Sequence, residues 1–213
     1  MSLNMKTLVV GTLGVNCYIL HNEGEREAVA IDPGGSEETV WHCLEESGLT
    51  LKAILNTHAH GDHIGAIDFL REKTGAKLYI HEADAPMLLD AHKNLSAFMG
   101  APIVTRPADI LLHGGEVLEI GSMKFTVLHT PGHSPGGVCY RMEDRVFSGD
   151  TLFAESVGRT DFPGSSAQAL LKSVREKLLV LPDETRVYCG HGPETTIGHE
   201  KRCNPYINGF GFM

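Results

Sequence analysis

The chain has 213 residues, 42% of them hydrophobic, which is enough to bury the core of one domain, or of one domain with a small appendage. Its formal net charge of -9 argues against a surface that binds nucleic acid or an anionic membrane. No apolar run approaches the roughly 18 residues of a membrane span and no signal-peptide pattern opens the chain, so we expect a cytoplasmic protein.

The first part of the chain alternates strand and helix patterns. Strands are predicted at residues 6–10, 15–21, 27–31, 52–55 and 77–81. Helices are predicted at residues 36–48 and 62–75, where apolar side chains recur at helical spacing. This β-α-β-α-β order predicts helices laid on a sheet. Asp32 precedes Pro-Gly-Gly and is either a turn former or a group that supports a nearby site.

The second part of the chain returns to strands before a helix. Strands are predicted at residues 116–120, 124–129, 137–141, 145–147 and 185–189, with a helix at 166–180. The two parts look alike, which predicts two sheets face to face with outer helices. Residues 82–113 are less regular and predict a lid, a pocket wall or a subunit contact, or else a helix with a covering loop.

Three histidines and a carboxylate are crowded into the stretch T-H-A-H-G-D-H, directly after the strand at 52–55. Alternation along an extended chain puts His58 and His60 on the same side. Asp62 is expected at the N-cap or in the first turn of the next helix, together with His63. The four donors would converge at the carboxyl end of a strand, where open α/β sheets place their sites. The alternative is a histidine-rich loop with no partner.

Further candidate ligands follow later strands. His133, Asp150 and His191 each lie in a glycine-containing loop at a strand end, where the backbone can turn sharply. The five cysteines are odd in number, scattered and without a Cys-x-x-Cys pair, so neither a disulfide framework nor a thiolate zinc site is expected. The chain also lacks the second histidine of a zincin helix.

The histidine-rich motif and the later Gly-His, Gly-Asp and Gly-His loops resemble the metallo-β-lactamase superfamily over nearly the whole chain. The resemblance implies an α/β fold, an αββα sandwich of two mixed sheets with outer helices, as a single domain over residues 1–213. It implies one metal ion bound by His58, His60 and His133, and a second bound by Asp62, His63 and His191. It also implies that Asp150 bridges the two ions, and Asp62 is in addition the candidate catalytic residue.

Two divalent ions suit this set of ligands, with zinc as the first expectation and iron or manganese as alternatives. Coordination lowers the pKa of water to about 7, so that a bridging hydroxide can attack at neutral pH. Two ions about 3.5 to 4 Å apart also bind the substrate oxygen and stabilise charge on the leaving group.

Within the superfamily, the stretches FSGDTLF, GRTDFPG and HGPETT resemble the short bacterial glyoxalase II type. This resemblance implies a hydroxyacylglutathione hydrolase that cleaves the thioester of S-lactoylglutathione or a related hydroxyacyl thioester. Longer glyoxalase II enzymes continue into a helical domain that contacts glutathione, whereas 22 residues follow His191 here. One alternative is a mononuclear-iron persulfide dioxygenase, which has a similar fold and a Gly-Arg-Thr-Asp-Phe stretch. Another is a metal-binding module without catalysis.

Substrate contacts are less defined. Arg159 is the first candidate for binding a substrate carboxylate, although it would equally pair with Asp161, and Lys201 is a weaker candidate. Four aromatic residues either line the pocket or pack in the core: Tyr140, Phe162, Tyr206 and Phe210. We expect a small-molecule thioester as partner, and the apolar tail at 207–213 predicts docking on its own domain or on a second subunit in a homodimer.

Overall fold

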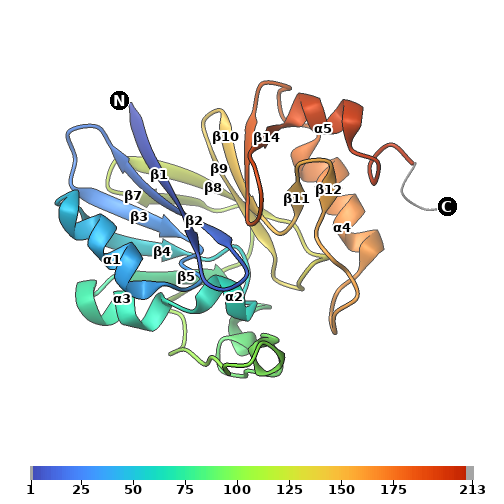
Figure 1. The fold of residues 1–213 in the computed structure, drawn as a ribbon. Helices are drawn as coiled ribbons and strands as arrows, with labels where there is room; N and C mark the ends of the chain where they lie inside the picture. Colours follow the sequence, from blue (N-terminus) through green and yellow to red (C-terminus); the bar gives the residue numbers. More distant parts are fainter. Residues whose placement is uncertain (1, 210–213) are drawn as a thin grey trace.

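The computed structural model describes residues 2–209, in which two six-stranded sheets face each other and carry helices on their outer sides (Figure 1). The first sheet has the order β1 (Leu3–Val10), β2 (Val15–Asn22), β3 (Glu27–Ile31), β4 (Thr50–Leu55), β5 (Lys77–His81) and β6 (Ile110–Leu112). The second has the order β14 (Thr195–Thr196), β13 (Arg186–Cys189), β10 (Arg145–Gly149), β9 (Val138–Met142), β8 (Met123–His129) and β7 (Val117–Ile120). A small ribbon joins β11 (Leu152–Phe153) to β12 (Ser156–Val157).

Both sheets are mixed. In the first, β1 to β3 are antiparallel neighbours and β3 to β6 run parallel. In the second, β10 and β13 are parallel and the other pairs are antiparallel. The predicted αββα sandwich of two mixed sheets is therefore confirmed.

The core consists of three apolar layers, as this architecture requires. Helices α1 (Glu37–Glu46) and α3 (Ile67–Thr74) pack on the first sheet. Helix α4 (Ala167–Ser173), its continuation as a π-helix at Val174–Leu178, and α5 (Ile197–Cys203) lie on the outer side of the second sheet. Alternation along β2 shows how one strand serves two layers, because Ile19 faces the helices whereas Tyr18 and Leu20 face the second sheet.

The structure differs from the predicted elements at a few places. The helix predicted at 62–75 is divided into α2 (Gly61–Ile64) and α3, because the backbone N–H of Ala66 donates to the carbonyl of Pro33 in the neighbouring turn. The irregular residues 82–113 contain two short 3-10 turns and strand β6. Helix α5 was not predicted.

No helix among residues 2–209 is long and apolar enough to cross a membrane. The predictions for Phe210 and for the end of the apolar tail concern residues 210–213, which lie outside the described residues.

Candidate metal centre

All seven predicted ligands meet at one edge of the sandwich. His58 and His60 lie in the segment between β4 and α2, and Asp62 and His63 lie on α2. The other three come from the loop between β8 and β9, the end of β10 and the end of β13: His133, Asp150 and His191. Their donor atoms form a first triad of His58, His60 and His133 and a second triad of Asp62, His63 and His191. Each triad takes two ligands from the first half of the chain and one from the second.

The first triad consists of three buried imidazoles. His60 Nδ1 lies 2.9 Å from His133 Nε2, and burial together with the neighbouring His133 lowers the pKa of His60 to about 3. Burial also holds the pKa of His58 well below its usual value. His133 Nδ1 donates to the carbonyl of Arg159 at 2.8 Å, which leaves Nε2 free to bind a cation. Neutral imidazole is the form that binds metals.

The second triad mixes carboxylate and imidazole. Asp62 Oδ2 lies 3.2 Å from His191 Nε2 and 3.8 Å from His63 Nε2. Asp150 lies between the triads, with Oδ1 3.4 Å from His63 Nε2 and Oδ2 3.5 Å from His133 Nε2. One carboxylate is thus within reach of both triads.

The donors fit two cations. Three buried ligand atoms have no hydrogen-bond partner among the described residues: His58 Nε2, His63 Nε2 and Asp150 Oδ1. An unsatisfied buried polar atom costs about 1 to 3 kcal/mol, so three of them gathered in one place need an explanation. His60 Nδ1 and His133 Nε2 also face each other across 2.9 Å. One cation in each triad would satisfy these atoms, and imidazole with carboxylate suits zinc, iron or manganese.

Asp32 supports the second triad from behind. Its buried carboxylate accepts hydrogen bonds from the backbone N–H of Thr57 at 2.7 Å and from the Thr57 hydroxyl at 2.6 Å. The same carboxylate lies 3.0 Å from His63 Nδ1. Of the two roles considered for Asp32, the supporting role near the site is therefore the one that these contacts favour. A carboxylate behind a histidine ligand fixes its tautomer and raises its basicity.

We expect Asp32→Asn to weaken metal binding at the second triad about 10- to 100-fold, the range usual for such supporting groups. The amide keeps the shape but loses the charge that orients the His63 ring. Competition with a fluorescent chelator would measure the metal affinity. Asp109→Asn, a matched change at a partly exposed aspartate that pairs with Arg71, should leave it unchanged. Equal affinities in the two variants would contradict a supporting role for Asp32.

Asp84 is a second buried carboxylate, and sequence reasoning missed it. It accepts hydrogen bonds from Ser134 Oγ at 2.7 Å, from the N–H of Gly136 at 2.6 Å and from the N–H of Ala59 at 3.3 Å. Burial raises its pKa, although these donors oppose the shift. Asp84 therefore ties the His133 loop to the segment that carries the first two histidines. It lies in the irregular part of the chain, where no pattern marked it.

A cavity of about 920 Å³ opens above the triads. Its floor is formed by metal-site residues: His60, Asp62, His133, Asp150 and His191. Its walls are formed by Leu13, His92, Leu95, Phe98, Met99, Phe153, Arg159, Phe162 and Pro163. Arg159 and Phe162 were predicted individually, and four more wall residues belong to the segment 82–113, for which a pocket wall was one of the predicted roles: His92, Leu95, Phe98 and Met99.

Arg159 lies at a position that is compatible with both of its predicted roles. It lines the cavity, and its guanidinium also donates to both carboxylate oxygens of Asp161, at 3.0 and 2.8 Å. The guanidinium lies 4.5 Å from the centre of the Phe162 ring, close enough for a cation-π contact.

Two predicted substrate contacts lie away from the cavity. Tyr140 is fully buried between the sheets, and its hydroxyl donates to the carbonyl of Asn56 at 2.7 Å. Lys201 lies on α5, where Nζ pairs with the Asp183 carboxylate at 2.6 Å. Neither residue lines the cavity, and nor does Tyr206.

Comparison with known proteins shows which family this chain resembles. Residues 10–191 match the metallo-beta-lactamase superfamily. The chain is 43% identical to probable metallo-hydrolase YqgX of Bacillus subtilis, over 96% of this chain and 98% of that protein. It is 35% identical to hydroxyacylglutathione hydrolase GloC of Haemophilus influenzae, over 97% of this chain and 99% of that protein.

Solved structures give a consistent result. The BLEG-1 B3 metallo-beta-lactamase superposes with a TM-score of 0.92 at 45% identity, covering 96% of this chain and 99% of that one. TTHA1623 in a di-iron-bound form gives 0.84 at 40% identity, with coverage of 94% and 99%. ETHE1 from Myxococcus xanthus gives 0.81 at 34% identity, with coverage of 97% and 85%.

Proposed function

Because this chain belongs to the metallo-beta-lactamase superfamily, whose enzymes include metallo-hydrolases, we propose that it is a dinuclear hydrolase that cleaves hydroxyacyl thioesters, S-lactoylglutathione among them. The observation that carries the proposal is the pair of complete triads that share Asp150 at the floor of one cavity. The similarity to GloC along almost the whole of both chains supports thioester hydrolysis.

Each group in the site has a task in this reaction. Divalent cations, when bound, supply water with a pKa near 7 and electrostatic stabilisation of negative charge on oxygen. Asp150 keeps the two triads next to each other, and Asp62 and His191 present the second triad to the cavity. Arg159 on the wall is available to orient a substrate carboxylate if Asp161 releases it. We propose zinc as the native metal, while the di-iron form of TTHA1623 supports iron as the alternative.

A persulfide dioxygenase is the second candidate. The similarity to ETHE1 from Myxococcus xanthus supports it, as does the stretch from Gly158 to Phe162, which places Arg159 and Phe162 on the cavity wall. Such an enzyme uses a single iron and molecular oxygen. Metal stoichiometry and oxygen consumption therefore separate the two candidates.

The test begins with the purified protein and metal analysis. We expect two metal ions per chain and hydrolysis of S-lactoylglutathione, measured as the loss of thioester absorbance. Activity should be lost when a chelator removes the metal and should recover when zinc, iron or manganese is added back. A metal-loaded protein that opens no thioester in a panel of acyl and thiol groups would refute the proposal. One iron per chain with oxygen uptake on glutathione persulfide would favour the dioxygenase.

A further inference from the structure

The cavity walls are mostly apolar, in contrast to the ionic floor. Apart from His92 and Arg159, the wall side chains are Leu13, Leu95, Phe98, Met99, Phe153, Phe162 and Pro163. Phe98 is 75% exposed and Leu13 is 55% exposed, which is unfavourable for such large side chains unless something covers them. One phenylalanine lies beside each triad, with the Phe162 ring 5.5 Å from His60 and the Phe153 ring 6.2 Å from His191.

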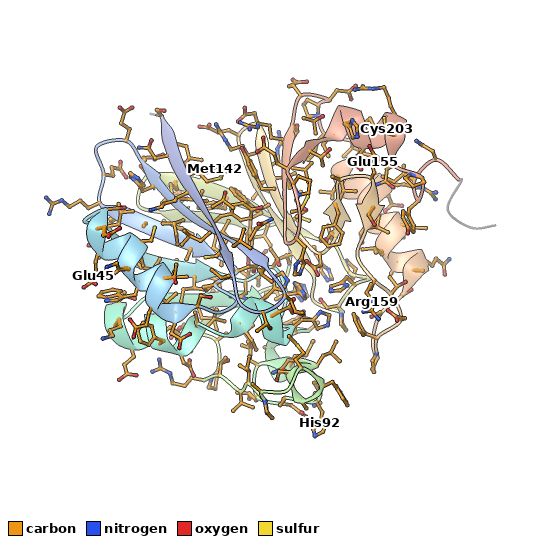
Figure 2. The ribbon with its side chains drawn as sticks, in the orientation of Figure 1. Glu45, His92, Met142, Glu155, Arg159 and Cys203 are labelled. Carbon is orange, nitrogen blue, oxygen red and sulfur yellow. The ribbon has the colours of Figure 1, made fainter. Side chains whose placement is uncertain are left out.

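The walls offer little to a strongly charged ligand. Among the described wall residues, Arg159 is the one with a permanent positive charge, and the carboxylate of Asp161 already neutralises it. Figure 2 shows Arg159 and His92 on the two segments that border the cavity. Glutathione carries carboxylates and an ammonium group, each of which loses hydration on binding and needs an ionic partner in return. These walls do not supply a full set of such partners.

The apolar wall at residues 91–100 is fixed directly to the metal-binding motif. The carbonyl of Asn94 accepts a hydrogen bond from the N–H of Gly61 at 2.7 Å, and its buried side chain donates to the carbonyl of Ile103 at 2.8 Å. A Cβ on Gly61 would lie too close to Ser96. Leu95 has φ 68°, a strained conformation for leucine that the surrounding contacts must hold in place. A wall whose backbone is already ordered reduces the entropic cost of binding an apolar group.

We infer that the preferred substrate is a thioester with an apolar arm, an aliphatic chain or an aromatic ring, that packs against Phe98, Phe162 and the neighbouring wall. This inference rests on the proposed function, because it names the substrate class of that site. The arm belongs either to the acyl group or to the thiol, and both sources make the same contacts.

Two series of substrates distinguish the sources. The first is acetyl-, butyryl- and hexanoyl-N-acetylcysteamine, and the second is S-lactoylglutathione against the lactoyl thioester of benzyl mercaptan. If the acyl group carries the arm, we expect kcat/KM to rise roughly fourfold per buried methylene. If the thiol carries it, the benzyl thioester should exceed S-lactoylglutathione about tenfold or more. A flat acyl series together with a preference for S-lactoylglutathione would overturn the inference and leave thioester hydrolysis intact.

Variants locate the effect. Phe98→Ser should lower kcat/KM for the substrates with an apolar arm more than for acetyl-N-acetylcysteamine, so that the gain from the arm disappears. Val180→Ser, at a valine that is 69% exposed and does not line the cavity, is the matched control and should behave as the unmodified protein. An unchanged substrate preference in the Phe98 variant would contradict the inference that the apolar wall binds the substrate.

Calorimetry tests the inference through binding affinity, without any need for catalytic turnover. With the metal-loaded protein, the uncleavable thioether S-hexyl-N-acetylcysteamine should bind at least about tenfold more tightly than S-methylglutathione, and Phe98→Ser should abolish the difference. Equal or reversed affinities would overturn the inference even if no thioester is hydrolysed, in which case the proposed function would fail separately.

Discussion

Asp150→Asn should lower kcat/KM for thioester hydrolysis about a thousandfold, the upper range for the loss of one preorganised group that stabilises charge. The carboxylate reaches His63 through one oxygen and His133 through the other, and an amide cannot offer an anionic oxygen to both triads. We also expect the bound metal to fall below two ions per chain. Steady-state kinetics and metal analysis of the same preparation would measure both effects.

The control for this variant is Asp144→Asn. Asp144 is an exposed aspartate in the turn between β9 and β10, at the opposite end of β10 from Asp150, where it pairs with Arg145. Its replacement should change neither metal content nor rate. Full activity with two bound ions in the Asp150 variant would show that the shared carboxylate is not needed for metal binding or for the reaction.

Gly34→Ala should reduce the free energy of unfolding by about 3 kcal/mol, the upper range for overpacking. A Cβ at this position would overlap the carbonyl of Asp62 and crowd the Cα of His63, so the turn and helix α2 would have to separate. For a chain of this size, the corresponding fall in melting temperature is roughly 6 to 12 °C. Thermal unfolding of the metal-loaded protein would measure it, and we expect weaker binding at the second triad as well.

Gly24→Ala is the comparison. Gly24 has φ 79° and no atom within 4 Å of a built Cβ, so alanine there meets only the conformational penalty of about 1 to 2 kcal/mol. A Gly34 variant as stable as the Gly24 variant would mean that the turn and α2 adapt easily to the added methyl group.

The ligand set was accessible from sequence because each ligand follows a strand. Strand ends in a sandwich meet at a shared edge, so residues as distant as His63 and His191 can be grouped from pattern alone. The order of the layers could also be predicted from the sequence. Strands that are buried on both faces and helices with one apolar side can stack in only a few ways.

Other features depended on contacts that no local pattern encodes. Asp84 acquires its role from Ala59, 25 residues earlier, and from Ser134 and Gly136, about fifty residues later. Tyr140 lies on a strand with two possible faces, and it is turned towards the opposing sheet. Lys201 follows His191 closely along the chain, yet α5 directs it to Asp183. The apolar wall likewise gathers Leu13, from the turn between β1 and β2, beside residues 92–99.

The division of each triad between the two halves of the chain affects folding as well as catalysis. A cation bound by His60 and His133 would cross-link positions 73 residues apart. By analogy with a disulfide that closes a loop of this length, the lost chain entropy of the unfolded state is worth on the order of 4 kcal/mol. The bound ions would thereby connect the two sheets as well as activate water. We therefore expect the metal-free protein to unfold more easily than the metal-loaded protein.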